Sequence, residues 1–160
     1  MPSWDQLYAA QVGASAALTG LLFVGISINM SKILAVPALP PRAMKSLALL
    51  VTILILSSLE LIPGESALAL GILLLVVVVS ATYVVFRLSA TVLRLNPVEY
   101  RRVAIYEFAL VAVVTVFYFG AAGAALTDNS ISGYLLVAGM LLSILIAIID
   151  SWVLLVEVNR

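Results

Sequence analysis

The chain has 160 residues, of which none is cysteine, none is histidine and only 10% are charged. The absence of cysteine excludes a disulfide framework, a thiol nucleophile and a thiolate metal site. The absence of histidine removes the commonest general base and the commonest ligand of transition metals. No polar stretch is long enough to form a substrate-binding domain. We therefore expect a protein that is not an enzyme, with no cofactor and no bound metal ion.

Long apolar runs are what the chain has in abundance, because 64% of its residues are hydrophobic. Each run is near or above the ~20 residues that a helix needs to cross a bilayer core. The five runs are Tyr8–Pro37, Ala43–Ile62, Ser66–Leu93, Val103–Leu126 and Ile131–Val156. We predict one all-α integral membrane domain over residues 1–160, a bundle of five transmembrane helices at about 3–36, 43–62, 66–94, 97–126 and 131–157.

The basic residues all lie in or near three places: the connection between the first two predicted helices, the connection between the third and fourth, and the C-terminal end. They are Lys32, Arg42, Lys45, Arg87, Arg94, Arg101, Arg102 and Arg160. A chain that crosses a bilayer five times puts these three places on the same side. Because Lys and Arg favour the cytoplasmic side, we predict a multi-pass protein of the plasma membrane, with the N-terminus outside and the C-terminus in the cytoplasm.

Local signals predict where some helices begin and end. Ser3-Trp4-Asp5-Gln6 resembles a capping box, which starts the first helix at Ser3. The segment Leu39–Arg42 contains two prolines, and we expect an extended connector there, because a residue before proline avoids helical geometry. Leu61–Gly64 is so short that the helices on either side of it are expected to form an antiparallel hairpin.

Two pairs of charged residues share a spacing. Arg87 and Arg94 are seven residues apart on the third predicted helix, and Asp150 and Glu157 are seven residues apart on the fifth. Seven residues is about two helical turns, so each pair lies on one helix face. If these two parallel helices touch, Arg87 would pair with Asp150 and Arg94 with Glu157. We predict an ion-pair clamp; a cytoplasmic vestibule or ion site, and independent snorkelling of each side chain, are the alternatives.

The first helix is unusual in its polar and small residues. Polar side chains recur along one slowly rotating stripe: Gln11, Ser15, Thr19, Ser27 and Asn29. They are candidates either for interhelical hydrogen bonds or for the lining of a pore built from copies of this helix. Small residues are candidates for close helix packing, in the first helix Gly13, Ala17 and Gly20 and in the fourth helix Gly120 and Ala124.

Three segments carry a resemblance to known proteins. They are Ser15–Asn29, the stretch Leu-Pro-Pro-Arg-Ala that ends at Ala43, and Asp150–Glu157. With these segments the chain resembles, from end to end, a family of small bacterial polytopic membrane proteins, some of which are labelled as modulators of the FtsH protease. Ser15–Asn29 also resembles the pore helix of Orai-type calcium channels, but this chain has five predicted crossings instead of four and no glutamate at the filter-like position.

These observations predict a non-catalytic membrane protein that associates with itself or with another membrane protein, as a component or modulator of a complex. A homo-oligomeric ion channel lined by the first helix is the alternative, and a small-solute transporter is the third hypothesis. Transport is the least favoured because no ionisable residue lies near the middle of a predicted span, where coupling sites are usually found. The expected partners are the lipid bilayer and another protein chain, and not nucleic acid.

Overall fold

The computed structural model describes residues 4–64, 66–96 and 101–155, and all of the regular secondary structure in these ranges is helical. The helices are α1 (Asp5–Ile28), α2 (Met30–Ala35), α3 (Leu39–Glu60), α4 (Ala67–Leu95), α5 (Arg101–Leu126) and α6 (Ile131–Leu155). Five of them, all except α2, are long and apolar enough to cross a membrane. The predicted all-α class and the predicted number of long helices are therefore confirmed.

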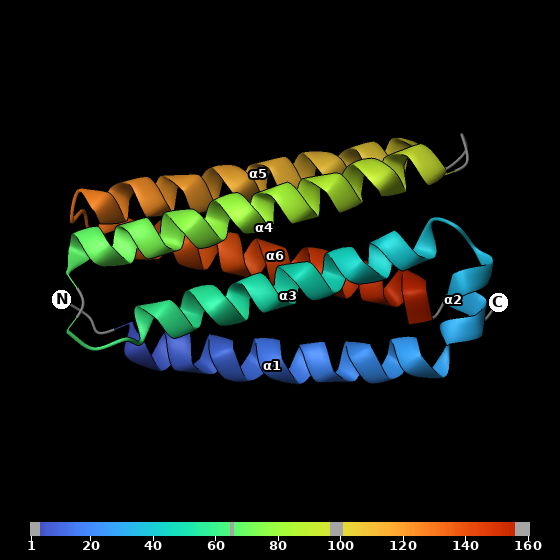
Figure 1. The fold of residues 1–160 in the computed structure, drawn as a ribbon, viewed down its shortest axis with the longest axis horizontal. Helices are drawn as coiled ribbons and strands as arrows, with labels where there is room; N and C mark the ends of the chain where they lie inside the picture. The colour runs from blue at the N-terminus through green and yellow to red at the C-terminus, as the bar shows by residue number, and fades with distance from the viewer. Residues whose placement is uncertain (1–3, 65, 97–100, 156–160) are drawn as a thin grey trace.

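The first predicted helix is interrupted, so the expected continuous helix over 3–36 is wrong. Asn29 has backbone angles of φ −102° and ψ 15° and separates α1 from α2. Its side chain donates a hydrogen bond to the carbonyl oxygen of Gly25 at 3.0 Å. Asparagine side chains compete with the helical backbone in this way, and such residues often end helices. The chain then turns, and α2 runs across the end of the bundle (Figure 1). The capping residue expected at Ser3 lies outside the described residues.

The two prolines do not form the expected extended connector. Pro40 and Pro41 occupy the first turn of α3, which begins at Leu39 instead of Ala43. The first turn of a helix is where proline is tolerated, because its missing N–H would have no acceptor within the helix. As a result, Arg42 and Lys45 lie on the first two turns of a helix and not on a loop.

Short turns join α3 to α4 and α5 to α6, as the sequence predicts. Gly64 has a φ of +78°, which glycine adopts without steric cost. Ser66 caps α4, since its hydroxyl oxygen accepts a hydrogen bond from the backbone N–H of Ala69 at 3.2 Å. In the second turn, the side-chain oxygen of Asn129 accepts from the N–H of Ile131 at 3.1 Å. Each turn makes the helices on its two sides antiparallel neighbours (Figure 1).

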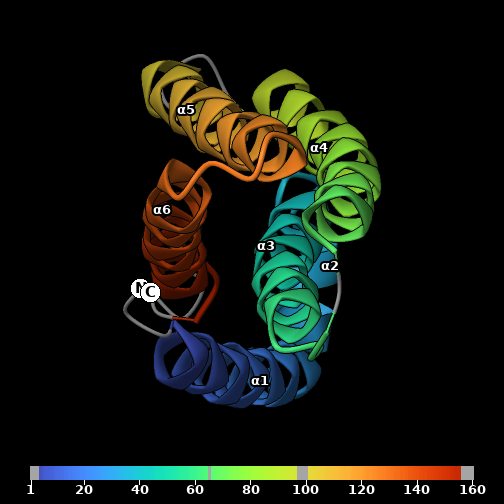
Figure 2. The same ribbon diagram turned by 90° about the vertical axis from the view of Figure 1, so that its left-hand side faces the viewer.

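Helix α3 lies at the centre of the arrangement, because it packs against α1, α4 and α6. Helix α5 packs against α4 and α6 on the other side of the bundle. The end-on view shows the resulting order, with α1 at one edge of the bundle and α4 and α5 at the other (Figure 2). Helices α4 and α6 do not pack against each other along their described lengths.

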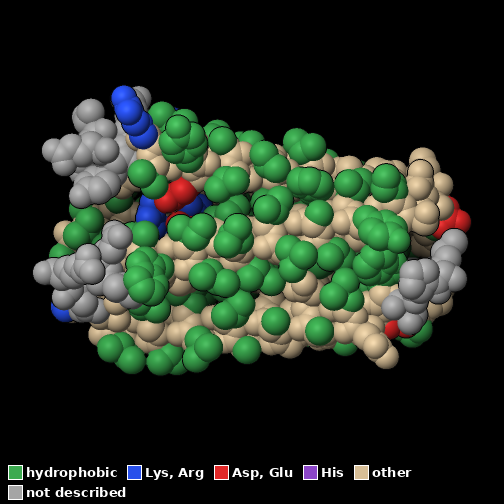
Figure 3. Space-filling model, turned by 180° about the vertical axis from the view of Figure 1, so that it is seen from behind, with side chains coloured by type: hydrophobic (Ala, Val, Ile, Leu, Met, Phe, Trp, Pro, Cys, Tyr) green, Lys and Arg blue, Asp and Glu red, His purple; other side chains and the backbone are tan. Residues whose placement is uncertain are grey.

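The two ends of the bundle differ in charge. We call the end where α3 and α5 begin the basic end, because the described cations lie in the half of the bundle next to it: Lys32, Arg42, Lys45, Arg87, Arg94 and Arg102. The opposite end, the acidic end, has Asp5, Glu60 and Asp128 and no described cation. The lateral surface between the ends is mostly apolar (Figure 3). The helix arrangement therefore separates the charges as the predicted topology requires.

One glycine sets the distance between α4 and α5 and gives a test of this packing. A Cβ atom at Gly71 would lie 2.8 Å from the backbone nitrogen of Leu126, which cannot move without shifting α5. We expect Gly71→Ala to lower the free energy of unfolding by about 1–3 kcal/mol, as overpacking does. The measurement is thermal unfolding in detergent, followed by circular dichroism.

The matched control is Gly123→Ala on α5, where a Cβ atom would meet no described atom within 4 Å. We expect the control to unfold at or slightly above the temperature of the unmodified protein, because alanine is the better helix former. Equal unfolding temperatures for the two variants would show that α4 and α5 are not packed as described.

Candidate functional site

Four ionisable side chains meet inside the bundle near its basic end. We call Arg42 and Lys45 of α3, Glu107 of α5 and Asp150 of α6 the charge cluster. All four residues are buried: Asp150 is 0% exposed and Lys45 1% exposed. Charged groups are almost never buried unless they are paired. The cluster is therefore the strongest candidate for a site with a defined role in this chain.

The cations and carboxylates of the cluster are interleaved. The Lys45 Nζ lies 3.0 Å from Asp150 Oδ2 and 3.2 Å from Glu107 Oε2, so it bridges α5 and α6. The Arg42 Nη2 donates to both carboxylate oxygens of Glu107, at 2.8 and 2.9 Å. Its Nε lies 3.7 Å from Asp150 Oδ1. The Ser46 hydroxyl completes the group by donating to Asp150 Oδ2 at 3.3 Å.

The local sequence explains how one helix supplies both cations. Arg42 and Lys45 are three residues apart, which places them on the same face of α3. Glu107 lies in the second turn of α5, and Asp150 lies within two turns of the end of α6. At ~1.5 Å per residue, the four groups lie about 5–9 Å inside the helix ends. The antiparallel topology thus brings all four to one level of the bundle.

The cluster is nearly saturated, which limits its chemistry. Two positive and two negative groups give a formal sum of zero, and the contacts above occupy three of the four carboxylate oxygens with hydrogen bonds. Asp150 Oδ1 is buried and has no hydrogen-bond partner within the described ranges. Three or more potential metal-binding side chains do not come together anywhere in the described part of the chain. An arrangement in which charges satisfy each other is suited to holding helices together, and not to binding an added ion.

The cluster is not sealed on every side. The Glu107 side chain is 11% exposed and that of Arg42 is 8% exposed. The view from behind shows acidic and basic side chains at the bottom of a hollow in the apolar surface, toward the basic end (Figure 3). Water or lipid headgroups can therefore reach Glu107, which reduces the desolvation cost of the cluster.

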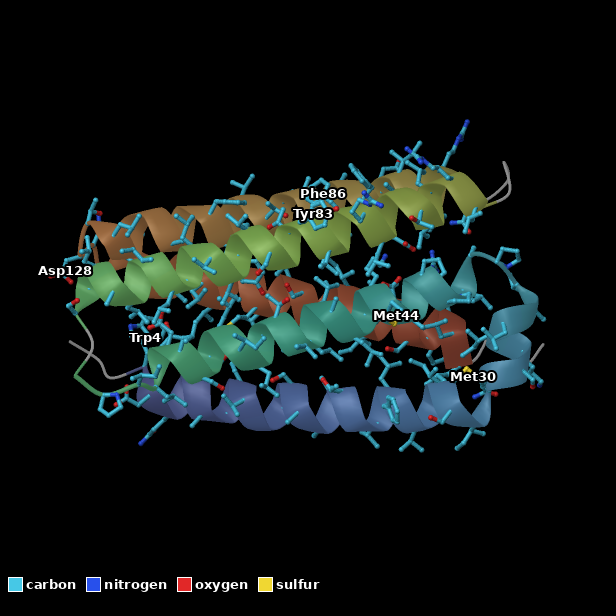
Figure 4. The ribbon with its side chains drawn as sticks, in the orientation of Figure 1. Trp4, Met30, Met44, Tyr83, Phe86 and Asp128 are labelled. Carbon is cyan, nitrogen blue, oxygen red and sulfur yellow. The ribbon has the colours of Figure 1, made fainter. Side chains whose placement is uncertain are left out.

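The predicted pairing of Arg87 with Asp150 is wrong. Asp150 is paired with Lys45 and Arg42 of α3, which lies beside α6, whereas α4 does not pack along α6. Arg87 is exposed and lies over the ring of Tyr83, 5.8 Å from its centroid, with Nη1 3.4 Å from the tyrosine hydroxyl. Tyr83 is labelled on α4 in Figure 4. The second predicted pair, Arg94 with Glu157, cannot be placed because Glu157 lies outside the described residues.

The polar residues of α1 do not share one surface. Gln11 and Ser15 are buried against the rest of the bundle, Thr19 and Asn29 are half-buried, and Ser27 is exposed. The three hydroxyls bond to carbonyl oxygens of their own helix, at 2.7 Å for Ser15 and Thr19 and 2.8 Å for Ser27. Side chains that satisfy themselves locally and face different directions do not form a continuous polar path.

The predicted packing residues fall into two groups. Gly13, Ala17 and Gly20 of α1 are all exposed, and a Cβ atom on either glycine would meet no described atom within 4 Å. On α5, a Cβ atom at Gly120 would lie 3.3 Å from Leu135 of α6, and Ala124 is half-buried. The small residues of α5 thus help to pack α5 against α6, whereas those of α1 lie on a surface that the monomer leaves open.

The charge cluster gives a direct test. We expect Asp150→Leu to destabilise the protein by about 3–5 kcal/mol, because it leaves Lys45 buried with one carboxylate fewer. The measurement is the midpoint of thermal unfolding in detergent. Arg87→Leu is the control, because Arg87 is the partner that the sequence predicts but the structure does not use. We expect Arg87→Leu to change stability by about 0.5 kcal/mol or less. A larger loss for Arg87→Leu than for Asp150→Leu would contradict the cluster.

The chain was compared with protein-family models, with curated proteins and with solved structures, and none of the three comparisons gives a match. The family resemblance seen in the sequence therefore stays a prediction.

Proposed function

We propose first that this protein is a multi-pass protein of the bacterial inner membrane, with its basic end in the cytoplasm. Five apolar helices of sufficient length support this proposal. So do the large hydrophobic side chains exposed around the bundle, such as Leu21, Phe23, Val76 and Val116, which lipid would cover. The orientation follows from the segregation of the described cations to one end.

We propose further that its role is non-catalytic and that it associates with a second copy of itself through α1. The supporting observation is one exposed surface of that helix, which we call the small-residue face. It is formed by Ala9, Gly13, Ala16, Ala17 and Gly20. The spacing is that of the small-xxx-small motif, repeated as Ala9-Gly13-Ala17 and as Ala16-Gly20.

Lipid contact alone does not require small residues. In a bilayer, helices associate mainly by van der Waals packing and by hydrogen bonds, and both depend on how closely the backbones approach. Within the described chain the space above Gly13 and Gly20 is open. The face is also uncharged, so an identical face can lie against it across a two-fold axis without repulsion. If the two α1 helices cross in a right-handed sense near Gly13 and Gly20, their N-terminal ends diverge. This divergence keeps the two Asp5 side chains apart.

The charge cluster supports a structural role for the remaining helices. It ties α3 to α5 and α6 by ion pairs. Helix α1 is attached to this unit mainly through α3, with little contact to α6. Helix α1 therefore lies at the edge of the bundle. One of its sides packs on α3, and the opposite side is exposed. This arrangement is suited to a component that docks and does not itself perform chemistry.

The channel hypothesis receives less support from the same residues. A pore lined by copies of α1 would need Gln11 and Ser15 at the central axis, but both are buried inside the protomer. Turning them outward would require rotating α1 on α3. The transporter hypothesis also lacks support, since the buried charges lie near one end of the helices and neutralise each other.

Because the chain has no cysteine, single cysteines can report the proposed contact. We expect Ala17→Cys to form a disulfide-linked dimer on mild oxidation in native membranes, because a two-fold contact would place the two cysteines within reach of each other. Val76→Cys is the matched control, since Val76 is also apolar and exposed but lies on α4. The readout is a non-reducing gel. Equal cross-linking at the two positions, or none at Ala17→Cys, would contradict the small-residue face as the interface.

The proposed orientation has its own test with two exposed serines, Ser130 in the α5–α6 turn and Ser31 in α2. In intact spheroplasts, a membrane-impermeant maleimide should label Ser130→Cys and should label Ser31→Cys only after lysis. The reverse pattern would show that the basic end faces outward. Labelling of both in intact spheroplasts would show that the chain does not span the membrane as proposed.

A further inference from the structure

A second feature lies at the acidic end, far from the charge cluster. A cavity of about 510 Å³ opens between the start of α1, the end of α3 and the α5–α6 turn. Three aromatic side chains line it, those of Trp4, Tyr8 and Tyr134, together with the acidic side chains of Glu60 and Asp128. No lysine or arginine is among the described residues that line it. Its volume falls in the range typical of small-molecule sites, about 300–1,000 Å³.

One wall of the cavity holds a polar group without a partner. Tyr8 is 3% exposed, and its hydroxyl has no hydrogen-bond partner within the described part of the chain. The hydroxyl lies beside Gly133, another lining residue, where a Cβ atom would come within 3.4 Å of it. The same Cβ atom would be 3.2 Å from the Trp4 indole nitrogen. Buried hydroxyls are normally hydrogen-bonded, so this one is a group that a ligand can satisfy.

The aromatic rings form a corner. Trp4 and Tyr134 are in edge-to-face contact, with centroids 4.8 Å apart and ring planes at 87°. Trp4 and Asp128 are labelled at the same end of the bundle in Figure 4. Aromatic faces attract cations through the ring quadrupole, and perpendicular rings near carboxylates are the surroundings that recognise quaternary ammonium groups.

We propose that this cavity binds a small organic cation of the quaternary-ammonium class, of about the size of choline. Glu60 and Asp128 supply the opposite charge, Trp4 and Tyr134 supply aromatic faces, and the Tyr8 hydroxyl bonds to a polar arm of the ligand. A metal ion fits less well, because only two carboxylates among the described lining residues could coordinate it. An anion is disfavoured because the carboxylates of Glu60 and Asp128 would repel it. The inference does not depend on self-association of the protein.

The test uses Trp4 as the reporter. The chain has two tryptophans, and the other one, Trp152, is exposed on α6 near the basic end. Trp152→Phe therefore leaves Trp4 as the only source of tryptophan fluorescence. This protein, in dodecyl maltoside, is titrated with choline and separately with 3,3-dimethyl-1-butanol, a neutral molecule of nearly the same shape. We expect a saturable change in emission with choline, and binding of the neutral molecule weaker by about tenfold or more.

Two variants in the same background test the proposed contacts. At a mildly alkaline pH that ionises the Glu60 carboxyl group, we expect Glu60→Gln to weaken choline binding about tenfold, because it removes a charged partner from a partly buried site. Asp5→Asn is the matched control, since Asp5 is an exposed acid at the same end that does not line the cavity. We expect Tyr8→Phe to weaken binding a few-fold without lowering the unfolding temperature, because the hydroxyl it removes makes no hydrogen bond in the described structure.

Several results would overturn the proposal. These are the absence of a saturable response to choline, equal affinities for choline and the neutral molecule, or equal losses for Glu60→Gln and Asp5→Asn. Displacement of choline by an equal concentration of Mg²⁺ would show that the cavity is a general cation site. A shift of the unfolding temperature of the unmodified chain by choline provides a second measurement, which does not depend on the Trp152→Phe background.

Discussion

The pairing of Lys45 with Glu107 and Asp150 is the constraint on which the rest of the bundle depends. A buried ammonium group needs its carboxylates at contact distance, and here they come from two different helices. Helix α3 carries both cations of the cluster, so the first turns of α3 must lie within reach of both the end of α6 and the start of α5. Helices α3 and α5 do not pack closely along their lengths, and the long side chains of Arg42 and Lys45 bridge that separation. The central place of α3 follows from this requirement.

The number of long helices and their antiparallel turns could be predicted because both depend on local sequence: lengths of apolar runs, Gly64 in a tight turn and Ser66 as a cap. The charge cluster could not be predicted in the same way. The seven-residue spacing predicts a pair between Asp150 and Arg87 only if α4 and α6 touch, and spacing along one helix does not specify which helix lies beside it. Prolines also favour the first turn of a helix, and Pro40 and Pro41 in that position put Arg42 and Lys45 on a helix face.

In helix α1, too, the sequence pattern does not determine which side chains share a surface. A polar residue every four positions predicts a stripe, but the break at Asn29 and the local hydrogen bonds of Ser15 and Thr19 divide that stripe into parts with different surroundings. The small residues raise the same difficulty, because glycine can serve packing within one chain or between chains. Glycines that a monomer needs for its own packing, such as Gly71, have backbone atoms against them, whereas Gly13 and Gly20 have none in the described chain. Only the structure separates these two uses of glycine.

The two ends of the bundle place their charged and polar groups in different surroundings. At the basic end four charges satisfy one another, so little capacity is left to bind anything else. At the acidic end the Tyr8 hydroxyl is buried without a partner beside a cavity lined by acids and aromatic rings. An unsatisfied buried polar group costs about 1–3 kcal/mol. Asp150 Oδ1 at the basic end also lacks a hydrogen-bond partner, but the Arg42 Nε lies 3.7 Å from it, whereas the Tyr8 hydroxyl lies beside a cavity that a ligand can enter. The site that we propose for an organic cation therefore lies at the end of the bundle opposite the charge cluster.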